Sequence, residues 1–197
     1  MVSEGYRVAS VLVLSPDMSQ QLHWPPFLRQ LHALEQSWNS YKVTYPREDA
    51  VHFLPFPIPQ FVSMLTDAVM AAPITWTSDQ DGPAPARFID VGCGPGTKVR
   101  LAQALFGLEG YGIDIIPTFI DEARSCGVKA DLTDAFDFSR YGEFDIVFAN
   151  RPSTLQDELE RHILVSMADE AVVIAANWRN SPSAGWSTGK PLGMRLS

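Results

Sequence analysis

The sequence predicts an α/β fold, with a doubly wound, mostly parallel sheet and a mainly helical N-terminal extension. Three observations predict it. A strand-like run, Phe88–Val91, leads directly into a loop with glycines at positions 92, 94 and 96. Strand-like apolar runs then alternate with helical stretches, which is typical of a parallel sheet covered on both faces. Ahead of this region stand two amphipathic helical patterns.

Residues 1–72 are predicted to form a helical extension or cover. Apolar residues recur at helical spacing in Pro26–Ser40 and in Gln60–Ala71, so we expect a helix in each. Between them lie Tyr41, Tyr45 and Phe56, which either line a pocket or join the extension to the sheet.

Residues 73–86 contain Asp-Gly-Pro-Ala-Pro and are predicted to be a linker, and residues 179–197 a short C-terminal tail. Residues 87–178 are then the core. Its predicted strands are Arg87–Val91, Gly110–Ile115, Gly127–Leu132, Phe144–Ala149 and Ala171–Asn177, and its predicted helices are Thr97–Phe106, Pro117–Ser125 and Leu155–Met167. Only a short turn, Thr133–Tyr141, is expected where a third crossover helix belongs.

The glycine loop is the main functional signal. Glycine tolerates positive φ and has no Cβ, so three glycines allow a sharp turn whose amides approach a ligand closely. The predicted helix that follows points its N-terminus at the same place, which favours a carboxylate or phosphate. The dinucleotide pattern G-x-G-x-x-G would need a glycine at position 97, where the chain has Thr97.

The pattern is instead D-x-G-x-G-x-G, beginning at Asp90, and it is followed by Gly112-Ile113-Asp114. In these motifs and in the order of elements over residues 88–178, the chain resembles the class I S-adenosylmethionine-dependent methyltransferases, which have a Rossmann-like fold. The resemblance implies methyl transfer with S-adenosylmethionine as cofactor.

The resemblance also implies roles for residues at the strand ends. Asp114 would accept both ribose hydroxyls, while Ile115, Asp131 and Leu132 would meet the adenine; Asp134 and Asp137 are alternatives to Asp131. The expected cofactor contacts near the methionine moiety and along the loop are Asp90, Gly92, Cys93, Gly94, Gly96 and Asn150. For Cys93, a packing role is favoured over a reactive thiol.

Asn150-Arg151-Pro152 lies where members of this family face their substrate. Amino-group methyltransferases often carry an Asn-Pro-Pro-aromatic motif at this position, and only Asn150 and Pro152 match it. Asn150, Arg151 and Pro152 are therefore weak candidates for catalysis, against the alternative of a loop before a capped helix. Methyl transfer depends largely on positioning, so a conventional catalytic residue is not required.

Other chemistries find less support in the sequence. The four histidines are scattered, and Cys93 and Cys126 form no zinc pattern, so no metal is expected. Two alternatives remain open: a catalytically inactive protein that binds the cofactor as a partner or regulatory subunit, and an NAD-dependent oxidoreductase.

Charge and composition indicate the partners. The formal net charge is -8, and residues 81–178 hold 8 basic and 16 acidic side chains, which favours a small-molecule or protein acceptor over nucleic acid. No membrane partner is expected, since Val8–Leu14 is too short to span a bilayer. The low cysteine content indicates a cytoplasmic location. The predicted fifth strand lies at the sheet edge, so the tail or extension covers it or it forms a homodimer contact.

Overall fold

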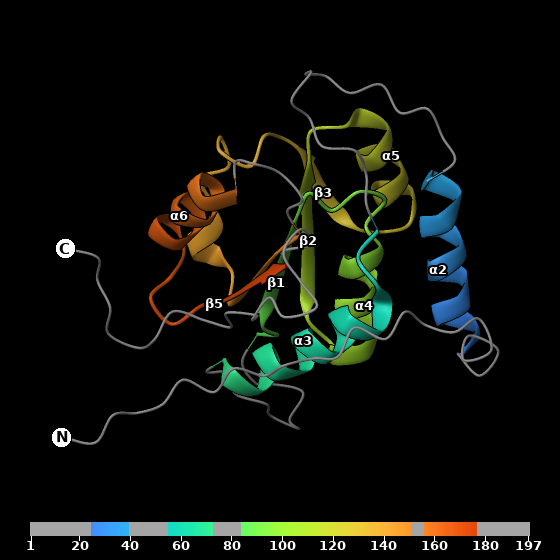
Figure 1. Cartoon of the computed structure of the whole chain (residues 1–197), viewed down its shortest axis with the longest axis horizontal. Helices are drawn as coiled ribbons and strands as arrows, with labels where there is room; N and C mark the ends of the chain where they lie inside the picture. Colours follow the sequence, from blue (N-terminus) through green and yellow to red (C-terminus); the bar gives the residue numbers. More distant parts are fainter. Residues whose placement is uncertain (1–24, 40–54, 73–83, 151–155, 177–197) are drawn as a thin grey trace.

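The computed structural model of the chain describes residues 25–39, 55–72, 84–150 and 156–176 (Figure 1). Within these ranges, helices lie on both faces of a five-stranded sheet. The strands are β1 (Arg87–Val91), β2 (Glu109–Asp114), β3 (Lys129–Leu132), β4 (Ile146–Asn150) and β5 (Val172–Ala176). The helices are α2 (Pro26–Asn39), α3 (Ile58–Ala71), α4 (Thr97–Phe106), α5 (Pro117–Ser125), α6 (Gln156–Ser166) and the 3-10 helix η1 (Tyr141–Glu143).

The sheet has the order β3-β2-β1-β4-β5, and every neighbouring pair is parallel. The chain runs outward from β1 to β2 and β3, and then returns to the other side of β1 to form β4. Strand order therefore reverses between β1 and β4, which is where open α/β sheets bind their ligands. The predicted doubly wound, parallel sheet is confirmed.

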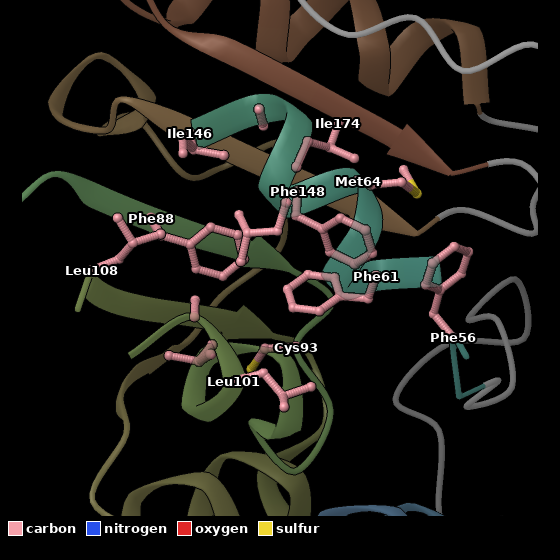
Figure 2. Close-up of a cluster of buried hydrophobic side chains, with 14 of the residues drawn as sticks. Phe56, Phe61, Met64, Phe88, Cys93, Leu101, Leu108, Ile146, Phe148 and Ile174 are labelled. Carbon is pink, nitrogen blue, oxygen red and sulfur yellow. The ribbon is translucent and has the colours of Figure 1, made fainter. Parts of the chain in front are cut away.

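One face of the sheet, which we call the first face, packs against α2, α3, α4 and α5. Phe61 of α3 stands edge-on to Phe88 of β1 and Phe148 of β4, with ring centroids 6.0 and 4.9 Å apart, and Figure 2 shows these rings at the centre of the core. Phe56 packs on Phe148 in the same way, at 5.6 Å. Phe56 therefore joins the extension to the sheet, which is the second of its two predicted roles.

The opposite, second face packs against α6, η1 and the segment after β3. Because side chains alternate across a strand, Ile89 and Val91 point to this face while Phe88 points to the first. The segment after β3 holds no α-helix, as predicted, and its side chains Phe138, Tyr141 and Phe144 cover this part of the sheet.

Two helices have the predicted bounds because their ends carry strong local signals. Helix α4 begins after Gly96 and ends before Gly107, and both glycines have left-handed backbone conformations, with φ of 79° and 65°. A Cβ at Gly96 would lie 3.0 Å from Val128 and 3.1 Å from Ala123, so the loop also needs glycine for close packing. Helix α5 begins with Pro117 in its first turn, where proline loses no hydrogen bond.

Other bounds differ from the predictions. Strand β3 begins at Lys129 rather than Gly127, because Gly127 has φ of 81° and ends the turn that follows α5. Strand β4 begins at Ile146 rather than Phe144, because η1 occupies the residues just before it. Strand β2 starts and ends one residue earlier than predicted, β5 spans Val172–Ala176, and α3 begins at Ile58.

Several predictions concern residues outside the described ranges: Tyr41, Tyr45, Arg151, Pro152 and the tail 179–197. The covering of the β5 edge and the homodimer through it stay predictions for the same reason. None of the described helices combines the length and the apolar character needed to cross a bilayer.

Candidate functional site

The glycine loop between β1 and α4 folds back onto the neighbouring strand β2. The amides of Gly92 and Cys93 both donate hydrogen bonds of 2.9 Å to the carbonyl oxygen of Ile113. Gly92, Gly94 and Gly96 all have positive φ, at 77°, 52° and 79°. The loop is therefore a compact turn fixed beside the carboxyl end of β2, and its positive φ angles account for the three glycines of the sequence motif.

Asp114, at the end of β2, is the residue that fixes this turn. One carboxylate oxygen accepts a hydrogen bond of 2.9 Å from the Gly94 amide, and the other accepts one of 3.0 Å from the Ile116 amide. The side chain is buried, which raises its pKa, and the hydrogen bonds from backbone amides oppose this rise. Asp114 thus lies at the predicted place and joins two strand ends through a carboxylate.

Close packing behind the loop explains two further residues. Gly112 of β2 lies against Cys93, and a Cβ at position 112 would be only 2.7 Å from the Cys93 Sγ. Burial raises the pKa of the Cys93 thiol well above its usual range, so the thiol stays protonated. Cys93 therefore packs the loop onto β2 and is not a reactive thiol.

Asp90, near the end of β1, is buried and points to the first face. Burial raises its pKa to about 7; the charge of Lys98 opposes the rise, while the carboxylates of Asp114 and Glu35 add to it. A carboxyl with such a pKa exchanges its proton near neutral pH. Perturbed groups of this kind are often found at functional sites.

A buried ion pair that the sequence did not predict lies close to Asp90 in the fold. Lys98, the second residue of α4, pairs with Glu35 of α2, and both side chains are buried. The Lys98 ammonium also lies 5.9 Å from the centre of the Phe61 ring of α3. The position of Lys98 was a possible signal in the sequence, because a lysine directly after a glycine loop lies at a helix N-terminus, where a cation is unfavourable. Nothing in the sequence indicated Glu35 as its partner.

Asp131 of β3 faces side chains of the second face. Its carboxylate accepts a hydrogen bond of 2.5 Å from the Tyr111 hydroxyl, and it lies 3.8 Å from Arg124 and 4.0 Å from Arg140. Burial and this hydrogen bond raise the pKa of Tyr111. The side chain of Asp131 is thus held by protein groups, a set of contacts that the sequence did not predict.

Two apolar side chains flank Asp114 at the carboxyl ends of the strands. Leu132 pairs with Asp114 in the register of β2 and β3, and half of its surface is exposed. Ile115, which follows Asp114, is half-buried. Leu132 and Ile115 are therefore available for contact with an apolar ring beside Asp114.

Asn150 is the last residue of β4 and is half-buried. Its strand is parallel to β1 and lies next to it, so Asn150 and the glycine loop are both at the carboxyl ends of the strands. Arg151 and Pro152 lie outside the described ranges. The described residues thus bring Asn150 to the predicted edge, while the rest of that motif is undescribed.

A family model matches the part of the chain that holds this candidate site. Residues 89–163 match the methyltransferase domain family, and this range includes the glycine loop and Asp114. Over this range, the chain is similar to a methyltransferase domain. This confirms the resemblance drawn from the sequence to the S-adenosylmethionine-dependent enzymes.

Comparison with solved structures shows the same kind of fold. An RNA methyltransferase from Salinibacter ruber, in complex with S-adenosyl-L-homocysteine, aligns with a TM-score of 0.53 and 19% identity, covering 72% of this chain and 100% of that one. The plantazolicin methyltransferase BpumL aligns with a TM-score of 0.49 and 16% identity over 78% of this chain, which spans 54% of that protein. A search of curated proteins found no match.

Proposed function

We propose that this methyltransferase binds S-adenosylmethionine at the carboxyl ends of β1, β2 and β3, and that it transfers the methyl group to a small molecule or a protein. One observation carries this proposal: the Asp114 carboxylate closes the glycine loop onto β2, beside a second buried carboxyl, Asp90. The ends of β1 and β2 and the glycine loop thereby present carboxylate oxygens and backbone amides close to the point where strand order reverses.

The residues of this edge fit the proposed cofactor. Gly92 is exposed, and a Cβ built on it would meet nothing within 4 Å, so the surface of the loop is open to a ligand. Thr97 Oγ1, in the first turn of α4, is buried and has no hydrogen-bond partner among the described residues. An unpaired buried hydroxyl is costly, which supports a polar ligand group near the N-terminus of α4.

We assign the contacts as follows. Asp114 holds the ribose hydroxyls; each carboxylate oxygen has two lone pairs, so it can accept these bonds and keep the bonds from Gly94 and Ile116. Ile115 and Leu132 pack on the adenine. Asp90 and Gly92 lie near the methionine moiety, with Cys93, Gly94 and Gly96 forming the loop between them. Asp131 contributes beside Leu132.

When bound, S-adenosylmethionine supplies a methyl group on a positively charged sulfur, which leaves as a neutral thioether. The chain supplies position rather than strong acid or base chemistry, since alignment of two reactants is worth up to about 7–11 kcal/mol. We propose that Asn150, at the carboxyl end of β4, orients the acceptor, with Arg151 and Pro152 as the neighbouring candidates for this role.

The acceptor class follows from charge. The chain has a formal net charge of -8, and a surface of this sign repels phosphate backbones, so a small molecule or protein is the favoured acceptor. We also propose a cytoplasmic location, supported by the free thiols Cys93 and Cys126.

Calorimetric titration tests the cofactor. The wild-type chain is titrated with S-adenosylhomocysteine and, in parallel, with NAD. We expect saturable binding of S-adenosylhomocysteine only. Gly94→Val should lose this binding, because valine strongly disfavours the backbone φ of 52° at this position and its side chain would block the loop. Binding of NAD alone would overturn the proposal. Methyl-release assays against small-molecule, protein and RNA pools then identify the acceptor, and no turnover with any pool would favour a cofactor-binding partner protein.

A further inference from the structure

The buried ion pair between Glu35 and Lys98 connects the N-terminal extension to the cofactor loop. Glu35 comes from α2, and Lys98 from the first turn of α4, 63 residues further along the chain. Figure 1 shows α2 lying beside α4. Both side chains are almost fully buried, at 3% and 5% exposure. Replacing a buried ion pair by apolar residues is often neutral or stabilising, so stability alone does not account for this pair.

Lys98 occupies an unfavourable place for a cation. The N-terminus of a helix carries partial positive charge, and the first turn of α4 contains no acidic residue. Burial adds a second cost. Glu35 compensates from another helix, and such a conflict between local preference and the observed residue is common at functional sites.

Both members of this pair act electrostatically on Asp90, a buried carboxyl of the proposed cofactor site. The Lys98 charge acts on the buried Asp90, and so do the charges of Glu35 and Asp114. Cys93, the remaining titratable neighbour of Asp90, is a protonated thiol. The groups that interact with Asp90 and Asp90 itself thus comprise three carboxyls and one ammonium. Because Glu35 is the ion-pair partner of Lys98, the ammonium neutralises Asp90 only in part.

We propose that Glu35 is a positioning residue of the cofactor site: by pairing with Lys98, it limits how far the ammonium neutralises Asp90. The pair thereby sets the electrostatic environment of the cationic amino group in the cofactor's methionine moiety, which S-adenosylhomocysteine retains. This inference rests on the proposed function, because it assumes that the cofactor binds at the glycine loop. Asp90 then gives up its proton when the cationic ligand binds, and affinity falls in acid as Asp90 becomes protonated.

The two halves of the pair have opposite effects on Asp90. In Glu35→Gln, the ammonium of Lys98 turns to Asp90 and favours its charged form. In Lys98→Met, Asp90 loses its cation and its charged form becomes less favourable. A pair that merely attached α2 to α4 would instead weaken binding in the same way when either half is lost.

The experiment measures the affinity for S-adenosylhomocysteine between pH 5.5 and 8.5 by calorimetry, with melting temperatures recorded for each variant. In the wild type, we expect affinity to fall roughly tenfold per pH unit below the midpoint of the Asp90 titration. The midpoint should move to lower pH in Glu35→Gln and to higher pH in Lys98→Met, by roughly one unit or more. Asp90→Asn should remove the pH dependence, which distinguishes Asp90 from Asp114.

Arg100→Met is the matched control. Arg100 is also on α4 and contacts α2, with its guanidinium 5.8 Å from the centre of the Phe27 ring, but it is not among the groups that act on Asp90. It removes a cation and an α2 contact, and should leave the midpoint unchanged. If Glu35→Gln does not fold, the double variant Glu35→Gln/Lys98→Met replaces it, and its midpoint must lie below that of Lys98→Met.

Three results would overturn the inference: equal shifts of both single variants in one direction, a shift of the same size in Arg100→Met, or wild-type affinity that does not depend on pH. In each of these, S-adenosylhomocysteine still binds, so the proposed function survives. Absence of binding by the wild type at every pH would overturn the proposed function together with the inference.

Discussion

Asp114 offers the sharpest test of the site, because its carboxylate serves both the fold and the proposed cofactor. Its two oxygens accept hydrogen bonds from the amides of Gly94 and Ile116. Asp114→Ala leaves both buried amides without an acceptor, and Asp114→Asn leaves one. The two variants therefore separate structural loss from loss of ligand contacts.

The expected losses of stability follow from these bonds. A buried donor without an acceptor costs about 1–3 kcal/mol. Asp114→Asn should therefore lose about 1–3 kcal/mol of unfolding free energy and Asp114→Ala about 2–6 kcal/mol. The loss is reduced in both, because each removes a carboxylate whose pKa is raised by burial. At about 2–4 °C per kcal/mol for a chain of this size, both changes are visible in a thermal melt.

Binding should fall by more than stability. Hydrogen bonds to a charged group are worth about 1.5–3 kcal/mol each, so losing two to ribose weakens affinity by roughly 10²–10⁴-fold. Calorimetry with S-adenosylhomocysteine, at a temperature where every variant is folded, measures this. The control is Asp121→Asn, an equal change of charge on the exposed surface of α5. If Asp114→Asn melts earlier yet binds as tightly as the wild type, Asp114 fixes the loop but does not hold the ribose.

Three further predictions concern the packing and charge around the loop. Gly112→Ala places a Cβ 2.7 Å from the Cys93 Sγ and should cost about 1–3 kcal/mol in urea unfolding. Combining it with Cys93→Gly should recover part of that cost, whereas additive losses would contradict the contact. Asp90 has a folded pKa of about 7 against 3.8, so its stabilising effect is full below pH 4 and lost as pH rises through 7; the advantage of Asp90→Asn over the wild type should grow between pH 4 and 8, and a constant difference would refute this. Phe61→Ala empties the centre of the first-face core and should lower the unfolding free energy by about 3–5 kcal/mol, as chemical denaturation can check.

The sequence was sufficient for features that depend on neighbouring residues. Gly96, Gly107 and Pro117 set the ends of α4 and α5 locally, so both helices were predicted to the residue. The start of β3 was missed because Gly127 follows an apolar pattern but adopts φ of 81° at the end of a helix. Glycine is compatible with both a strand and a turn, and tertiary packing decides between them.

The candidate site was predictable to the same extent, where it depends on motifs and strand ends. Asp90, Asp114 and the three loop glycines stand in one motif or at strand ends, and the parallel sheet brings strand ends together. The partners of Asp131 could not be read from the sequence, since Tyr111 lies on a different strand and Arg140 beyond the next loop. The Glu35–Lys98 pair required knowing where α2 packs, which is a property of the folded chain alone.

The distribution of buried polar groups links these observations. The buried polar side chains of the described residues come from β1, β2 and the helices of the first face, and they are Glu35, Gln60, Asp90, Thr97, Lys98 and Asp114. None of these six residues belongs to the core of the second face, where the Tyr141 hydroxyl donates a hydrogen bond to the Ala135 carbonyl oxygen. Burying polar groups costs free energy unless they are paired, so a fold selected for stability alone would have no reason to place them on one side. Their concentration on the first face supports the proposed binding of a charged ligand there, with α2 supplying part of the charge.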